Sequence, residues 1–244
     1  MSVAEGSEAL HLLLEVQAID TAIDQVRHQR SHHPLRSELS TLLAHQVHLT
    51  ERLAGERAGL DALATRQSEL EAAVTEGAER IAVLEKRMYS GEVSASRELQ
   101  AMSEEVASIR RRDSSIEDSI LEVMEEREPV ESAVAELEAQ LAEVVARAGQ
   151  LEAALAEADE SLAAQERELQ AQRDERSTGV PPDLLSRYSR LRERLGGVGV
   201  APLVDGRCGG CHLALSATEL DGVRRAPADA VLTCEQCGRL LVRP

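Results

Sequence analysis

A seven-residue repeat of apolar side chains limits what this chain can fold into more than any other feature. Between residues 39 and 88, positions at alternating steps of three and four form a seam that is apolar at eleven of fifteen positions. A second seam over residues 99–169 is apolar at eighteen of twenty-one positions and shows no shift of phase. A seven-residue repeat of this length is typical of a left-handed coiled coil rather than of a surface helix.

The two seams are separated by a short connector at residues 89–97. Gly91 can end the first helix in the left-handed conformation, and a serine after it can cap the second helix. Because the connector is short, the two helices should be antiparallel neighbours. Their apolar layers then match outward from Met88 and Leu99. We expect one intramolecular hairpin that extends about 75 Å from Leu39 to its tip, at a rise of about 1.5 Å per residue.

Composition and charge exclude several classes of protein. The chain of 244 residues has no Phe, no Trp and two Tyr, so it lacks the aromatic side chains that usually fill a globular core. Its formal net charge is −17, with a net −19 in residues 1–180 and a net +2 in residues 181–244. The long acidic part should be repelled by nucleic acid and by anionic membranes.

The sequence shows no sign of a secretory or membrane-spanning segment. Glu5 and Glu8 stand where a signal peptide would need basic residues, and the apolar run at residues 12–14 is too short for a signal core. No stretch approaches the roughly 18 apolar residues that span a bilayer. We therefore predict a cytoplasmic protein with no membrane partner, whose cysteines lie in a reducing compartment.

A shorter helical stripe precedes the first seam. It runs over residues 12–26 and is out of phase with the repeat that begins at Leu39. His32, His33 and Pro34 separate the two patterns, so we expect a break in the helix there. The first helix should then pack on residues near 150–175. Pro129 lies inside the second seam and lacks an amide hydrogen, so it should bend its helix without interrupting the seam.

Four cysteines near the C-terminus give the strongest chemical signal in the sequence. Cys208 and Cys211 form one Cys-x-x-Cys pair, and Cys234 and Cys237 form a second pair after twenty-two intervening residues. Two such pairs at this spacing predict four thiolates around one structural zinc ion. His212 should be exposed, because four thiolates already complete a tetrahedron. Iron in a rubredoxin-like site stays open, since spacing does not separate the two metals. Two disulfides or a redox pair fit a cytoplasmic chain poorly.

The residues around these pairs predict the rest of a zinc ribbon. A helix should run from Pro181 to Gly196, and Ser216 and Glu219 form a capping box that starts a short helix. Residues 231–233 and 240–242 have the pattern of short strands. The predicted fold is mainly α, with a long antiparallel coiled-coil hairpin and a small C-terminal C4 zinc ribbon. The predicted division is residues 1–180 for the kinked hairpin, 181–197 for a connecting helix and 198–244 for the ribbon.

The tip and the cysteine segments resemble those of the bacterial C4-type zinc-ribbon hairpin proteins. The resemblance rests on residues 88–99, on residues 201–212 and on the terminal run 234–242. It implies a long hairpin joined to a zinc ribbon, in a family of which many members are domains of unknown function. Some relatives in flagellated bacteria act as adaptors for an alternative sigma factor, flagellar parts or flagellar messenger RNA.

The sequence contains no nucleotide-binding glycine-rich loop and no nucleophile motif, so we expect no enzyme and no small-molecule substrate. The leading interpretation is an adaptor or scaffold in which the hairpin binds a protein partner through Tyr89, Glu92 and Arg97. Alternatively, Tyr89 only caps the last apolar layer.

Two other functions stay open. One is a factor that inserts into the secondary channel of RNA polymerase, and the other is a structural spacer.

The ribbon is the part of the chain that could contact protein or nucleic acid. Without aromatic rings in residues 197–244 it offers no base stacking, so any binding to nucleic acid should be weak and should fall steeply with salt. The phosphate contacts would come from five arginines: Arg207, Arg224, Arg225, Arg239 and Arg243.

Overall fold

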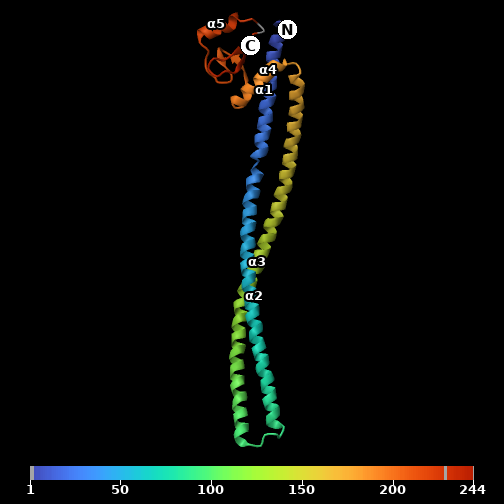
Figure 1. Cartoon of the computed structure of the whole chain (residues 1–244), viewed down its shortest axis with the longest axis vertical. Helices are drawn as coiled ribbons and strands as arrows, with labels where there is room; N and C mark the ends of the chain where they lie inside the picture. Colours follow the sequence, from blue (N-terminus) through green and yellow to red (C-terminus); the bar gives the residue numbers. More distant parts are fainter. Residues whose placement is uncertain (1–2, 228–229, 244) are drawn as a thin grey trace. The chain divides into compact units, whose positions relative to one another are not determined.

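Long helices account for most of the chain (Figure 1). The structure, a computed structural model, describes residues 3–227 and 230–243. Its helices are α1 (Val3–Ser31), α2 (Pro34–Tyr89), α3 (Ser96–Ser177), α4 (Pro182–Arg194) and α5 (Ala217–Arg225). Its strands are β1 (Val200–Val204), β2 (Arg207–Cys208), β3 (Leu232–Thr233) and β4 (Leu240–Val242). The predicted fold class, a mainly α chain with a helical hairpin and a C-terminal C4 zinc ribbon, is confirmed.

Residues 38–151 form one compact unit, in which α2 and α3 run side by side in opposite directions (Figure 1). Near the connector, Leu84 and Met102 share one buried cluster, and further along the hairpin Leu49 and Leu137 share another. These are layers that the seven-residue repeat predicts. α3 continues through Pro129 without interruption, as expected for a proline that leaves the seam intact.

At two layers where the seam is polar, the residue on the facing helix makes room for the polar side chain or forms a hydrogen bond with it. Gly77 lies beside Asp113, and a methyl group at residue 77 would be 2.4 Å from the carboxylate oxygens. The absent side chain therefore makes room for an acidic group inside the seam. At another polar layer, Arg127 donates a hydrogen bond of 2.6 Å to the side-chain oxygen of Gln67. The space beside Gly77 and the hydrogen bond of Arg127 let the repeat continue through these two polar layers.

A second compact unit contains the described residues up to Ser37 and those from Glu152 onward. The helix break is confirmed, since α1 ends at Ser31 and α2 begins at Pro34. The expected packing of α1 on the end of α3 is also confirmed. Arg27 of α1 contacts Glu166 at 2.6 Å, and Asp20 of α1 contacts Arg173 at 2.8 Å.

The core of this second unit joins the helices to the strands of the ribbon. A four-stranded sheet has the order β2-β1-β4-β3, with β1 and β4 parallel and the two outer pairings antiparallel. One buried cluster combines residues from α1, the segment between α3 and α4, α4 and the sheet: Leu10, Leu13, Val16, Val180, Tyr188, Leu191, Val200, Leu240 and Val242. The strands therefore share a hydrophobic core with the first helix of the chain.

A buried polar network ties α1, α3 and α4 together at the edge of this core. Asp20 of α1 is only 4% exposed. Its carboxylate accepts hydrogen bonds from the Tyr188 hydroxyl at 2.6 Å and from Arg173 Nε at 2.8 Å, and Arg192 Nε lies 3.6 Å away. Burial and the hydrogen bond to Asp20 raise the pKa of Tyr188 far above its ordinary value. The phenol therefore stays protonated and donates to Asp20.

Strands β1 and β2 were not predicted from the sequence, whereas β3, β4 and α5 were.

In the part of the chain that the structure describes, no helix combines the length and the apolar character needed to cross a membrane.

Candidate metal centre

Two tight turns hold the four cysteines. Cys208 ends β2 and begins the first turn, and Cys234 begins the second turn between β3 and β4. The amide of His212 donates to the carbonyl of Cys208 at 2.7 Å, and the amide of Gly238 donates to the carbonyl of Cys234 at 2.7 Å. Each turn brings its two cysteine side chains to the same side, as a zinc knuckle requires.

The four sulfur atoms meet in one cluster. All four lie within 4.8 Å of one another, with Cys208 Sγ 3.9 Å from Cys237 Sγ and Cys211 Sγ 3.8 Å from Cys234 Sγ. A zinc ion with Zn–S bonds of about 2.3 Å needs about 3.8 Å between sulfurs at the edges of a tetrahedron. The donor set and its spacing therefore fit one tetrahedral ion. In the described ranges 3–227 and 230–243, this is the one group of three or more His, Cys, Asp or Glu side chains placed to hold a metal.

Both turns need a residue with a positive φ, and a different residue type provides it in each turn. The residue after the second cysteine has a positive φ in both turns, 75° at Gly238 and 62° at His212. Gly238 adopts this conformation without strain, as its position in the sequence suggests. His212 is a less common residue for the left-handed region, although it follows its cysteine pair just as Gly238 does. The side chain of His212 is exposed, as predicted.

The surroundings of the sulfurs push their pKa values in different directions. Burial raises the pKa of Cys208 and raises that of Cys234 to about 12. At Cys237 burial also raises the pKa, but hydrogen bonds from the backbone and side chain of Arg239 and from neighbouring thiols outweigh it and bring the pKa to about 7. Zinc binds thiolates, so it must displace protons from Cys208 and Cys234 when it enters the site.

Arg239 links the metal site to the end of α4. Its Nε donates to the carbonyl of Val198 at 2.9 Å, and its Nη2 donates to the carbonyl of Leu195 at 3.0 Å. The side chain passes so close to Gly210 that a methyl group there would be 2.5 Å from Arg239 Cδ. Gly210 is therefore needed for close packing, and not for a positive φ as at Gly238.

We expect Gly210→Ala to lower the free energy of unfolding of this unit by about 1–3 kcal/mol, because overpacking displaces Arg239 from its two carbonyls. Thermal unfolding of the zinc-loaded protein measures the effect. Gly222→Ala is the matched control. Its site in α5 is open space, so the alanine should leave stability unchanged or raise it by up to about 1 kcal/mol. Equal effects of the two substitutions would contradict the packing role of Gly210.

The five ribbon arginines do not form one free basic patch. Arg239 donates hydrogen bonds to two backbone carbonyls, and Arg243 donates to the carbonyls of Val223, Ala226 and Pro227. Arg225 pairs with Asp221 within α5. Arg207 and Arg224 are exposed and have no ion pair among the described residues.

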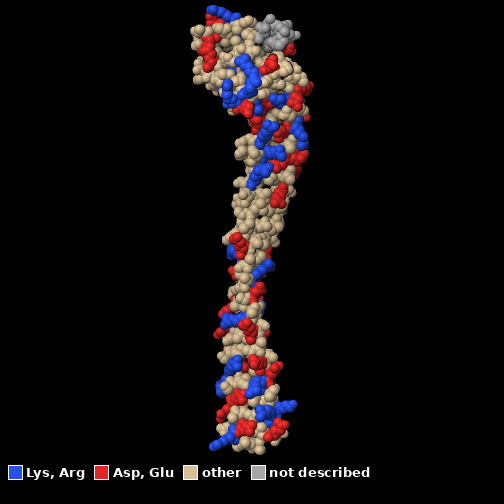
Figure 2. All heavy atoms as spheres, viewed as in Figure 1, with Lys and Arg blue, Asp and Glu red and all other residues tan. Residues whose placement is uncertain are grey.

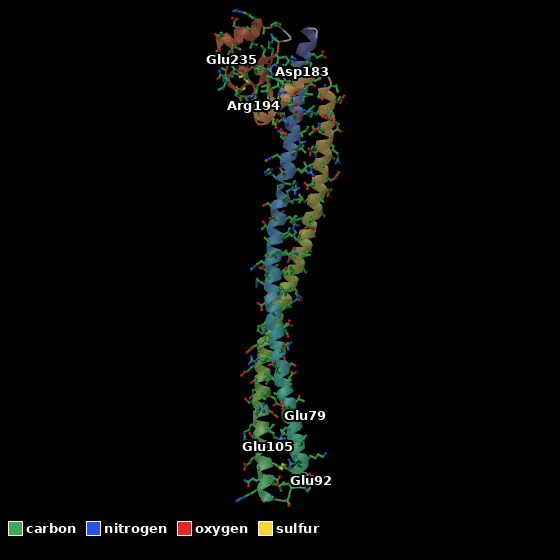
Figure 3. All side chains as sticks on the ribbon, in the orientation of Figure 1. Glu79, Glu92, Glu105, Asp183, Arg194 and Glu235 are labelled. Atoms are coloured by element: carbon green, nitrogen blue, oxygen red, sulfur yellow. The ribbon has the colours of Figure 1, made fainter. Side chains whose placement is uncertain are left out.

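The hairpin tip lies in the other compact unit. Tyr89 is 83% exposed, whereas the connector residue Val93 is half-buried and packs against the last apolar cluster. Glu92 and Arg97 are both exposed, and Figure 3 shows Glu92 in the connector, with Glu79 and Glu105 further along α2 and α3. Val93, which packs on the end of the seam, lies outside the seven-residue repeat and so was not predicted from it.

Comparison with known proteins agrees with this geometry. The CT398-like coiled coil hairpin domain family matches residues 16–196, and the C4-type zinc ribbon domain family matches residues 207–241. The chain belongs to the CT398-like hairpin family. The expected resemblance is thus confirmed, and the four clustered cysteines of a C4-type ribbon are consistent with one structural zinc ion.

The relatives of this chain are similar over nearly their whole length. The uncharacterized protein Rv2229c of Mycobacterium tuberculosis is 28% identical over 234 residues, which cover 95% of this chain and 94% of that protein. A structure from Mycobacterium smegmatis is 23% identical with a TM-score of 0.86 and covers 100% of this chain and 99% of its own. CT398 from Chlamydia trachomatis is 22% identical with a TM-score of 0.74 over 100% of both chains. These likenesses show the fold, and the family points to a non-enzymatic, scaffold-like protein.

Proposed function

We propose that this protein is a zinc-binding adaptor whose hairpin tip binds a protein partner. One observation carries the proposal, namely the 83% exposure of Tyr89. The seam does not need this ring, because Val93 covers the end of the cluster that contains Leu84 and Met102. An exposed Tyr among charged side chains is the kind of residue that anchors protein interfaces. Glu92 and Arg97 would add polar contacts around it.

The zinc ribbon gives the adaptor a second contact region in this proposal. Its residues 198–244 would follow a connecting helix at 181–197 and a hairpin at 1–180. Arg207 and Arg224 are the exposed basic side chains that remain for phosphate groups. Two such contacts give weak, salt-sensitive binding to nucleic acid at most, so protein is the favoured ligand. A cytoplasmic location fits the proposal, because reducing conditions keep four thiols available for metal.

The geometry favours the adaptor over a factor for the secondary channel of RNA polymerase. Such factors depend on paired acids at the tip. Here Glu98 lies 3.9 Å from Arg87, and Glu92 is in the connector. The tip therefore presents one carboxylate that is unpaired among the described residues, beside an exposed Tyr, and a second carboxylate that is paired with Arg87.

Affinity capture with the full-length protein tests the tip. Tyr89→Ala combined with Arg97→Ala should release the partners that the unchanged protein retains from its native cell, while helical circular dichroism stays the same. Truncation of a central aromatic anchor typically costs about 2 kcal/mol or more, or roughly thirtyfold in affinity.

Leu121→Ala is the control, because Leu121 is 58% exposed on α3 of the same hairpin but lies away from the connector. It should leave all partners bound. If the double variant at the tip also retains every partner, Tyr89 and Arg97 are not the contact surface, and the spacer function gains support.

A further inference from the structure

Three large apolar side chains are exposed on the hairpin far from its tip. Leu43 and Val47 on α2 are 40% and 59% exposed, and Val145 on α3 is 47% exposed. None of them belongs to the buried seam. Coiled-coil positions outside the seam usually carry charged or polar side chains, so three large apolar residues there need an explanation.

The three side chains lie on the same side of the hairpin. Leu42 and Val144 belong to one buried cluster, and Leu43 and Val145 are the residues that directly follow them. Leu43 and Val47 are one helical turn apart, so they share a face of α2. The ion pair between Arg57 and Glu138 at 2.5 Å supports this placement. Arg57 is two seven-residue repeats from Leu43, and Glu138 is one repeat from Val145, so the pair marks the same flank.

This part of the hairpin is also nearly free of charge. Residues 39–50 contain no charged side chain, and residues 139–150 contain only Glu143 and Arg147, which cancel. Arg147 pairs with Glu38 at 3.1 Å, which places that charge on the opposite flank of the seam. On the face drawn in Figure 2, this stretch of α2 and α3 is almost without red and blue spheres, whereas the end near the connector mixes both colours. We call the side that carries Leu43, Val47 and Val145 the apolar flank.

The distribution of charge along the chain indicates which binding partner fits the apolar flank. The remaining residues carry the whole net charge of −17, so two copies of this chain repel one another along most of their length. At the apolar flank the local net charge is zero, and an apolar surface is complementary to itself. We propose that the apolar flank is the contact between two copies of this chain, related by a two-fold axis that places Val47 of each copy against the flank of the other.

Other exposed apolar residues of the hairpin do not meet these conditions. Val83 is 53% exposed on α2, but Arg80, Glu85 and Lys86 surround it in sequence. Leu121 lies between Asp118 and Glu122 in the sequence, and Met124 lies between Glu122 and Glu125. A second copy would have to remove water from charged side chains at either place.

Sedimentation velocity of the full-length, zinc-loaded protein over a range of concentrations tests the proposal. We expect a reversible dimer, and Val47→Glu should weaken its association by about tenfold or more, because two carboxylates would face each other without partners. Val83→Glu is the matched control, since it makes the same substitution at a similarly exposed site and changes the net charge equally. It should leave the dimer unchanged.

A photoreactive residue at position 47 gives a second, independent measurement. It should crosslink one copy to another within the purified protein, whereas the same residue at position 83 should not. A chain that stays monomeric at every concentration, or equal weakening by Val47→Glu and Val83→Glu, would overturn the proposal. If the purified chain is monomeric and residue 47 crosslinks only to a different protein in the cell, the flank belongs to that protein and not to a second copy.

Discussion

Cys211→Ser should remove the bound zinc and unfold the ribbon while leaving the hairpin helical. The substitution takes one of four thiolates from a site whose sulfurs are all within 4.8 Å of one another. Structural zinc typically contributes about 10–16 kcal/mol to the folding of a small domain. Because β1 and β4 share a core with Leu13 and Tyr188, the loss should also expose Tyr188. Residues 38–151 form a separate compact unit and should retain their circular dichroism signal.

The fluorescence of Tyr188 can report this unfolding directly. The chain has no Trp and two Tyr, so Tyr89→Phe makes Tyr188 the sole fluorophore. His212→Asn in the same background is the control. It changes the exposed neighbour of Cys211, and Asn tolerates the positive φ at this position. Metal analysis should find about one zinc ion per chain in the control and none in Cys211→Ser. Zinc retained by Cys211→Ser, or iron in the unchanged protein, would contradict the assignment of a four-thiolate zinc site.

Asp20→Asn should lower the free energy of unfolding of the unit containing α1 and the ribbon by roughly 3 kcal/mol. Removing the charge leaves two arginines in a buried network without their shared partner, and breaking such a pair typically costs about 3–5 kcal/mol. The lower end of this range applies, because Arg173 and Arg192 keep 23% and 24% of their side chains exposed. Denaturant unfolding followed by Tyr188 fluorescence, in the background with Tyr89→Phe, measures the change.

Asp24→Asn makes the same chemical change one turn further along α1. Asp24 also contacts Arg192, at 2.5 Å, but its side chain is 46% exposed. Exposed ion pairs usually contribute less than about 1 kcal/mol, so this variant should be close to the unchanged protein. Similar losses from Asp20→Asn and Asp24→Asn would show that burial of the network does not determine its contribution.

Features with a local cause could be predicted from the sequence. The hairpin follows from a repeat that is visible residue by residue, and its matching layers follow from the short connector. The capping box was predicted from Ser216 and Glu219, and in the structure each side chain bonds the backbone amide of the other residue. The metal site was predicted from two Cys-x-x-Cys pairs, whose sulfurs meet as the spacing requires.

Features that depend on distant partners could not be predicted in this way. β1 includes Pro202 and becomes a strand because it pairs with β4, about 40 residues later. The sequence shows Asp20 as one acid among many, although it contacts residues that follow it by more than 150 positions. The spread of arginines in the ribbon likewise gave no sign that Arg239 and Arg243 donate to backbone carbonyls.

The shared core of α1 and β4 has a consequence for synthesis on the ribosome. Leu10, Leu13 and Val16 are made more than 200 residues before Leu240 and Val242, which help to bury them. The hairpin of residues 38–151 is a compact unit of its own, so it can fold while the chain is still growing. The apolar stripe of α1 stays uncovered until β4 has emerged from the ribosome. A truncated polypeptide that stops before β4 would leave the apolar stripe of α1 exposed. Chaperones and proteases could then bind it.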